Sequence, residues 1–261
     1  MKTIIYITLI LTIIFNENRG NYNLVLECFT HYKTSEKKLL SDIKAQDSIN
    51  VQMIFNNYLN AIGGKEKVKS IYNIVSHYNS KVDNNGQSIN IEVKKIVTDE
   101  RQYLLETSLF TDDYSTISLI SIDGNNGFSI YNGSKKELSQ SQIEDFKKNI
   151  DEKLFQELQS SSNFKLIGVD VLNGDDVYVV ENIFNMKKSF YSIATGLKLK
   201  EIQITEVNGQ NLITVIEYFD YRPIEGILFP FRQIESKGDQ IYEMNTSEIK
   251  INQYLPEDTF R

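Results

Sequence analysis

Residues 71–250 form a succession of short segments in which apolar and polar side chains alternate. In 89–94, for example, two isoleucines and a valine share one face, and the polar residues share the other. Asn-Gly and Asp-Gly pairs, which favour tight turns, punctuate the pattern at 123–124, 132–133, 173–174 and 208–209. Because strand follows strand with one helical interruption, the pattern predicts a strongly curved antiparallel sheet without βαβ units.

About twelve strands are expected, near 71–82, 87–97, 101–110, 114–122, 126–131, 163–171, 175–184, 187–193, 197–206, 211–221, 227–236 and 240–250. Two of them, at 117–122 and 177–180, are apolar on both faces and need cover on both sides. An antiparallel sheet that curls without filling its interior can hold an apolar guest. The pattern therefore indicates an incomplete β-barrel and favours binding over catalysis.

Two amphipathic helices are predicted beside the sheet. In the first, apolar residues recur at helical spacing, and Asp47 or Ser48 can cap the start, while Gly63 and Gly64 can end the helix. Its apolar face comprises Val51, Phe55, Tyr58, Leu59 and Ile62. A short helical turn over 65–70 then leads into the sheet.

The second helix interrupts the strands. Ser139 is followed three residues later by Gln142, which is the spacing of a capping box. The apolar stripe of Ile143, Phe146, Ile150, Leu154 and Leu158 extends the predicted helix to near Gln159. Together the two helices are expected to cover one face of the curved sheet or to close its mouth.

The composition fits one globular domain over 49–261, since the 261 residues are 41% hydrophobic and 24% charged. The formal net charge of −7 argues against nucleic acid as a partner. Lysine pairs such as Lys187–Lys188 are interpreted as solvated strand or turn positions. The single cysteine, Cys28, cannot form an internal disulfide and is interpreted as an ordinary thiol.

The N-terminus has the outline of a signal peptide. Lys2 precedes an apolar stretch at 4–15 that is short for a membrane-spanning helix. We predict a signal peptide at 1–22, a polar linker or loosely attached helix at 23–48, and export to the periplasm; an uncleaved membrane anchor is the alternative.

Candidate chemistry is scarce. The histidines His31 and His77 have no partner at metal-ligand spacing, and no G-x-S-x-G elbow is present. The acidic, glycine-containing stretch 123–127 resembles the start of a calcium-binding loop, but Phe128 and Ser134 stand where an EF-hand has its glycine and its glutamate. It is therefore interpreted as a hairpin turn. Gly63-Gly64-Lys65 follows a helix, whereas a P-loop precedes one. We therefore expect no enzyme activity, no cofactor and no metal site.

Five segments, in their order and spacing, resemble the exported LolA-like family of outer-membrane lipoprotein-sorting proteins. The resemblance covers 49–261 and is strongest to a branch that also occurs as a C-terminal extension of insulinase-type peptidases. The segments are YLNAIGGKEKVKSI (58–71), DGNNGFSIYNGSKKELSQSQIEDFK (123–147), LNGDDVYVVE (172–181), YSIATGLKLKEIQ (191–203) and FDYRPIEGILFPFR (219–232).

This resemblance implies a curved, incomplete antiparallel barrel closed by helices, and a role in shielding acyl chains of a lipid or lipoprotein in the periplasm. The implied partners are a lipid or acylated lipoprotein and a membrane-associated donor or acceptor, and a monomer is expected. The alternative function is a protein-interaction module without catalytic activity, related to the C-terminal part of insulinase-type peptidases.

Inward-facing apolar strand residues are the candidates for a lipid-binding surface, and residues of the first helix are candidates for a lid. The strand candidates are Ile89, Ile91, Val93, Ile117, Leu119, Val177, Val179, Ile202 and Ile204. The lid candidates are Phe55, Tyr58 and Leu59. Each of them could instead be an ordinary core residue.

Overall fold

The computed structural model describes residues 49–84, 87–100, 102–111, 115–149, 155–207, 210–238 and 240–261. The predicted signal peptide, the predicted linker and Cys28 lie outside the described residues. Among the described residues, no helix combines the length and the hydrophobicity that crossing a membrane requires.

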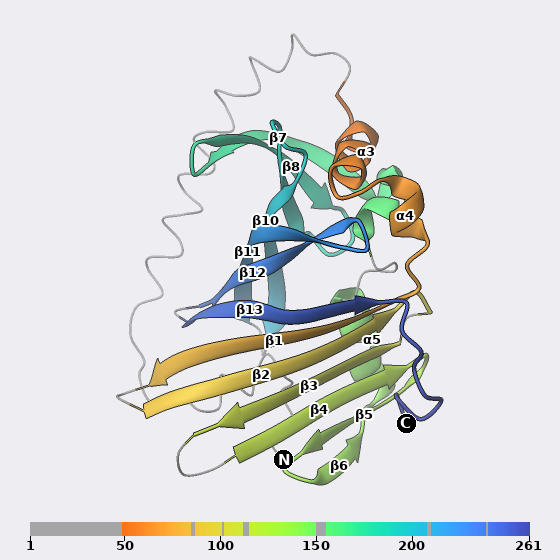
Figure 1. Cartoon of the computed structure of the whole chain (residues 1–261), viewed down its shortest axis with the longest axis vertical. Coiled ribbons are helices and arrows are strands. Elements are labelled where there is room, and N and C mark those ends of the chain that lie inside the picture. Colours follow the sequence, from red (N-terminus) through yellow and green to blue (C-terminus); the bar gives the residue numbers. More distant parts are fainter. Residues whose placement is uncertain are drawn as a thin grey trace.

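Thirteen strands form one sheet in which every neighbouring pair is antiparallel, as the alternating pattern predicts (Figure 1). The first six are β1 (Asn73–Asn84), β2 (Gln87–Thr98), β3 (Tyr103–Phe110), β4 (Ser115–Asp123), β5 (Asn126–Tyr131) and β6 (Ser134–Glu137). The others are β7 (Phe164–Leu172), β8 (Asp175–Asn182), β9 (Lys188–Ser192), β10 (Lys198–Val207), β11 (Gln210–Ile224), β12 (Ile227–Lys237) and β13 (Gln240–Ile251). The strand that the sequence did not predict is β6, whose residues are all polar and exposed.

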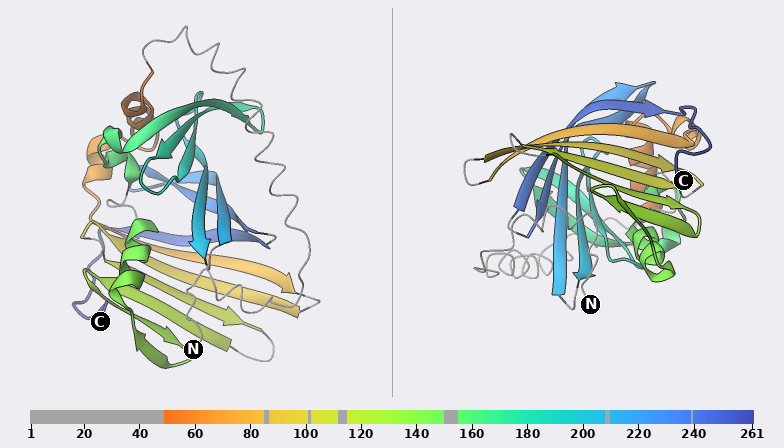
Figure 2. Two further views of the ribbon diagram at one scale, coloured as in Figure 1. Left: turned by 180° about the vertical axis from the view of Figure 1, so that it is seen from behind. Right: turned by 90° about the horizontal axis from the view of Figure 1, so that it is seen from below.

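The sheet is not closed into a barrel. Its order, β6-β5-β4-β3-β2-β1-β13-β12-β11-β10-β9-β8-β7, leaves β6 and β7 as two separate edges. The chain builds outward from β1 to β6, crosses to the other edge, and builds back from β7 until β13 pairs with β1. Figure 2 shows that the resulting sheet is strongly curved, so the prediction of an incomplete antiparallel barrel is confirmed.

The first predicted helix is α3 (Val51–Ala61), and the turn after it is α4 (Lys65–Lys69). The N-cap is Asn50, whose side chain accepts a hydrogen bond from the Met53 amide, so the predicted caps were wrong. The end is as predicted, because Gly63 and Gly64 follow with φ of 133° and 103°. All five residues of the predicted apolar face are buried.

The second helix, α5 (Gln140–Asn149), begins with the predicted capping box. The Ser139 amide donates to Gln142 Oε1 at 2.8 Å, and the Gln142 amide donates to Ser139 Oγ at 3.4 Å. The prediction of a helix to Gln159 was wrong. Two short 3-10 turns follow the undescribed residues 150–154, namely η2 (Gln156–Leu158) and η3 (Ser161–Asn163). Leu158 of the predicted stripe packs against the α3 core cluster, and polar side chains of η2 contact the sheet as described below.

Both helices cover the same face of the sheet, which we call the inner face. Ile251 packs in the core cluster of α3, and Ile122 packs with Ile143 of α5. One continuous row of register partners joins Ile251 to Ile122 across β13, β1, β2, β3 and β4, and such partners point to the same side. Helical cover of one face is thus confirmed.

The C-terminal residues 252–261 cover part of the opposite face, which we call the outer face. Phe260 packs against Val75, Ile96 and Leu104, which are register partners on β1, β2 and β3. Ser121 Oγ also donates a hydrogen bond to the Phe260 carbonyl at 2.8 Å. Strand β4, predicted to need cover on both faces, therefore has α5 on one side and this segment on the other.

Candidate functional site

Three of the predicted lipid-binding residues lie together on the inner face. Ile89 and Ile91 are buried in a cluster with Leu109, and Val93 packs beside them. Ile91 and Leu109 are register partners, and alternation along β2 places them on the same side as the helix-covered row. The structure thus brings together a compact apolar surface on β2 and β3.

The other strand candidates lie on the outer face. Ile117 and Leu119 alternate with Ile120 and Ile122 of the α5 cluster, so they point the other way. Val180 packs in the α3 cluster on the inner face. Its neighbour Val179 therefore points to the outer face, where it is buried in a separate cluster. The separate cluster also contains Val177 and Ile202. Ile204, which shares the face of Ile202, is 36% exposed, and Ile117 is 52% exposed.

The three lid candidates are buried between α3 and the sheet. Phe55 contacts the rings of Phe164 and Tyr191, with centroids 4.9 Å and 5.9 Å away. Tyr58 contacts the ring of Tyr191 at 5.6 Å, and Leu59 lies in the same core cluster. These contacts hold α3 on the inner face, and whether the helix moves as a lid stays a prediction.

Buried hydroxyl groups border the apolar surface. Ser80 is the register partner of Ile91, and Ser118 is the partner of Thr107, which itself pairs with Val93. Within the described part of the chain, neither Ser80 Oγ nor Ser118 Oγ has a hydrogen-bond partner, although both are buried. Each hydroxyl can therefore bond a polar group that approaches this surface.

A cluster of buried charges lies on the inner face beneath η2, and we call it the charged cluster. Lys198 Nζ lies 2.8 Å from Glu157 Oε1 and 3.0 Å from Glu201 Oε1. Lys187 Nζ lies 3.7 Å from Glu201 Oε1, so two lysines face two glutamates. The expectation that Lys187 is solvated was wrong, because the residue is only 8% exposed.

Neutral side chains complete the charged cluster. Tyr191 Oη donates to Glu157 Oε1 at 2.6 Å, and Tyr218 Oη donates to Glu201 Oε2 at 2.7 Å. Gln156 Nε2 donates to Tyr191 Oη at 2.9 Å, which joins η2 to β9. These bonds satisfy one oxygen of Glu157 and one of Glu201, and they fix η2 against the sheet. Among the described residues, Glu157 Oε2 and Gln156 Oε1 are buried without a hydrogen-bond partner.

The charges in the cluster shift the pKa values of their neighbours. Burial raises the pKa of Glu201, but Lys187, Lys198 and the Tyr218 hydroxyl lower it by more, so the net pKa lies well below the usual range. Burial raises the pKa of Tyr191, and Glu157 raises it further. At neutral pH the Glu201 carboxylate is ionised and the Tyr191 phenol is protonated, so the two act as acceptor and donor, respectively.

The lowered pKa makes stability depend on pH. Since the pKa of Glu201 in the folded state lies below its ordinary value of 4.5, its contribution is present above that pH and is lost as the pH falls. Between about pH 6 and pH 3, a range that brackets the ordinary pKa, we expect the free energy of unfolding of the wild type to fall more steeply than that of Glu201→Gln. Chemical unfolding at a series of pH values measures both curves, and parallel curves would contradict this expectation.

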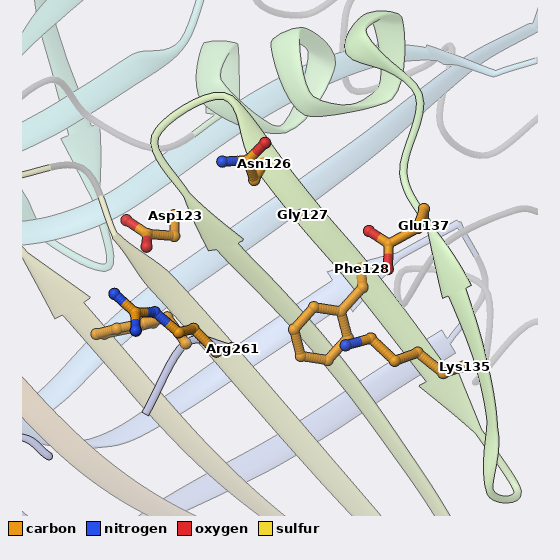
Figure 3. Close-up of a pocket in the computed structure, with 8 residues that line it drawn as sticks. Asp123, Asn126, Gly127, Phe128, Lys135, Glu137 and Arg261 are labelled. Carbon is orange, nitrogen blue, oxygen red and sulfur yellow. The ribbon is translucent and has the colours of Figure 1, made fainter. Parts of the chain in front are cut away.

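A hollow lies on the outer face near the end of the chain, with a volume of about 340 Å³. Phe128 and Phe260 contribute apolar surface, and the charged residues at its rim are Asp123, Lys135, Glu137 and Arg261. Figure 3 shows Arg261 near Asp123 and the Lys135 side chain against the Phe128 ring, where Nζ lies 3.7 Å from the ring centroid. Within the described residues, no group of three or more His, Cys, Asp or Glu side chains is placed to hold a metal ion.

No family model matches the sequence, and a search of curated proteins finds no match. Solved structures do match. A LolA superfamily protein from Nitrosomonas europaea aligns over 82% of this chain and 98% of its own, with 12% identity and a TM-score of 0.52. The fold of this chain is LolA-like. A DUF1329 family protein from Desulfovibrio piger aligns with the same coverage, identity and TM-score.

At 12% identity, these matches concern the LolA-like fold and not the activity. They confirm the fold that the sequence resemblance implied. The likeness to the C-terminal extension of insulinase-type peptidases stays a prediction.

Proposed function

We propose that this protein is a non-enzymatic carrier that shields acyl chains of a lipid or lipoprotein against the inner face of its sheet. The observation that carries the proposal is the buried apolar cluster of Ile89, Ile91 and Leu109 with Val93 beside it, which lies on the helix-covered face of a LolA-like sheet that is not closed into a barrel. The acyl chains would contact these inner-face residues and not the candidates on the outer face.

The chemistry of the surface suits an acyl guest. Each buried CH₂ group contributes about 0.8 kcal/mol, so a chain can be held without charged contacts. The hydroxyl groups of Ser80 and Ser118 can donate hydrogen bonds to ester or amide oxygens at the head of such a chain. An apolar surface bordered by a few hydroxyl groups therefore favours an acylated guest over a charged one.

The remaining elements of the proposal follow from the carrier role. Phe55, Tyr58 and Leu59 would move with α3 when the guest enters. The protein would be exported with the help of residues 1–22, act as a monomer in the periplasm, and exchange its guest with a membrane-associated donor or acceptor.

Native mass spectrometry of residues 23–261, purified from a bacterial periplasm without detergent, tests the proposal. We expect a lipid or an acylated protein to co-purify at a stoichiometric level. A guest-free mass, together with no binding of an added fluorescent fatty acid, would exclude the carrier role and favour the alternative of a protein-interaction module without catalytic activity.

Ile91→Glu tests the location of the site. A carboxylate at this position should abolish binding of a fluorescent fatty acid, because the charge would be desolvated beside the acyl chain. Ile117→Glu is the matched control, since Ile117 lies on the outer face and is 52% exposed. If Ile91→Glu unfolds the protein, Val93→Asp at a less buried neighbouring position takes its place. Equal binding by a folded inner-face variant and the control would place the guest elsewhere.

A further inference from the structure

The turn between β8 and β9 carries three large apolar side chains on four consecutive residues, 183–186, which we call the apolar tip. Ile183 is 51% exposed, Phe184 is 75% exposed and Met186 is 60% exposed. Single exposed apolar residues are common on protein surfaces, but a concentrated group marks an interaction site. The apolar tip is therefore a candidate contact surface.

Hydrogen bonds from polar neighbours close the turn that carries the apolar tip. The Phe184 amide donates to Asn182 Oδ1 at 2.9 Å, and the Lys187 amide donates to Asn185 Oδ1 at 3.1 Å. The Met186 amide donates to the Asn182 carbonyl at 2.8 Å. Both asparagine side chains are thus used inside the turn, and the side chains left at the surface are the apolar ones.

The backbone at Met186 strengthens this assignment. Its φ of 55° lies in the left-handed region, which disfavours side chains with a Cβ and favours glycine or asparagine. A long apolar side chain occupies this position all the same. Because the side chain is 60% exposed, packing within the chain does not account for it.

The charges around the apolar tip are neutralised within the fold. No Asp or Glu occurs in 182–188, although the whole chain has a net charge of −7. The flanking Glu181 lies 3.9 Å from Lys188, and Glu201 is paired with Lys187 at 3.7 Å. The tip can therefore approach anionic headgroups without an unpaired carboxylate of its own beside them.

We propose that the apolar tip docks the protein on a lipid bilayer, with Phe184 at the boundary between headgroups and acyl chains. A hydrogen-bonded turn with three apolar side chains and no unpaired negative charge fits that boundary, where aromatic and aliphatic groups leave water. Three side chains give reversible binding and not permanent anchoring. This docking does not rest on the carrier role, because a protein without a bound lipid would dock equally well.

The absence of tryptophan from the chain makes a local test possible. Phe184→Trp in the full chain places a single reporter at the tip, and vesicles of phosphatidylethanolamine and phosphatidylglycerol with brominated acyl chains serve as the probe. We expect a blue shift and quenching of the tryptophan emission. Ile241→Trp, at a position that is 68% exposed in β13, should show neither. The readout is local, so attachment through residues 4–15 cannot produce it.

Loss of the neighbouring side chains should weaken the docking. Ile183→Ser and Met186→Ser, each in the Phe184→Trp background, should raise the lipid concentration at half-maximal quenching about tenfold. If Phe184→Trp disturbs the fold, Ile183→Trp supplies the reporter. An emission that vesicles leave unchanged would overturn the proposal. An emission that changes only with vesicles containing membrane proteins would also overturn it, because the partner would then be a protein.

Discussion

Lys198→Met should lower the free energy of unfolding by about 3–5 kcal/mol, because it leaves the buried Glu157 carboxylate without a counter-ion and leaves Glu201 with Lys187 alone. Lys198 Nζ lies within 3.0 Å of an oxygen on both Glu157 and Glu201, and the Glu157 side chain is completely buried. Methionine keeps most of the volume of the side chain, so the loss reports the charge and not a cavity. Urea unfolding monitored by circular dichroism measures the difference.

Lys250→Met is the matched control for this variant. Lys250 also forms a 2.8 Å ion pair, with Glu248, but both side chains are about half exposed. Exposed pairs contribute about 0–1 kcal/mol, so the control should be nearly neutral. Equal losses in the two variants would show that the charged cluster does not stabilise the fold more than a surface pair does.

A double variant separates the two sources of the loss. If Lys198→Met is destabilising because it leaves the Glu157 carboxylate unpaired, adding Glu157→Gln should recover part of the lost stability, while Glu201 keeps its ion pair with Lys187. If the variant is destabilising because packing has changed, the added substitution should recover nothing. The distinction matters because the charged cluster holds η2 against the sheet.

Features that depend on neighbouring residues were predicted well from the sequence. The capping box of Ser139 and Gln142, the glycines after α3 and most hairpin turns are local, and the structure contains them. Strand β6 was missed because its residues, Ser134–Glu137, carry no apolar alternation and pair only at an edge. Local patterns thus predict elements that stabilise themselves, and they miss elements that depend on a partner.

The sequence did not predict which face of a strand is covered, and it did not predict the charged cluster. Both depend on contacts between residues that are distant in the sequence. Alternation shows that Val179 and Val180 point to opposite sides, but not which side α3 covers. In the same way, Glu157 and Lys198 look like surface residues until η2 packs against β10. The four candidates chosen from the strands with two apolar faces, Ile117, Leu119, Val177 and Val179, were therefore all placed on the outer face by the fold.

Gly63→Ala should be the most costly change to the backbone near the inner face. Gly63 has a φ of 133°, and a Cβ at this position would lie 2.3 Å from the Gly226 carbonyl oxygen in the turn between β11 and β12. That oxygen belongs to the backbone and cannot rotate away. The turn would have to shift, which would disturb the 2.7 Å hydrogen bond from the Leu228 amide to the Ile62 carbonyl. We expect a loss of about 3 kcal/mol or more, as the sum of backbone strain and overpacking.

Gly64→Ala separates strain from overpacking, since Gly64 also has a positive φ, 103°, but a Cβ there would have no atom within 4 Å. It should lose about 1–2 kcal/mol from backbone strain alone. Thermal and urea unfolding of the two variants measures the difference in stability between them, and equal losses would show that α3 does not pack tightly on the turn.

The size of this difference in stability bears on the proposed function. If Gly63 packs tightly against the turn at Gly226, the C-terminal end of α3 stays in place during any lid movement. Phe55 and the N-terminal turn of α3 would then have to move the most.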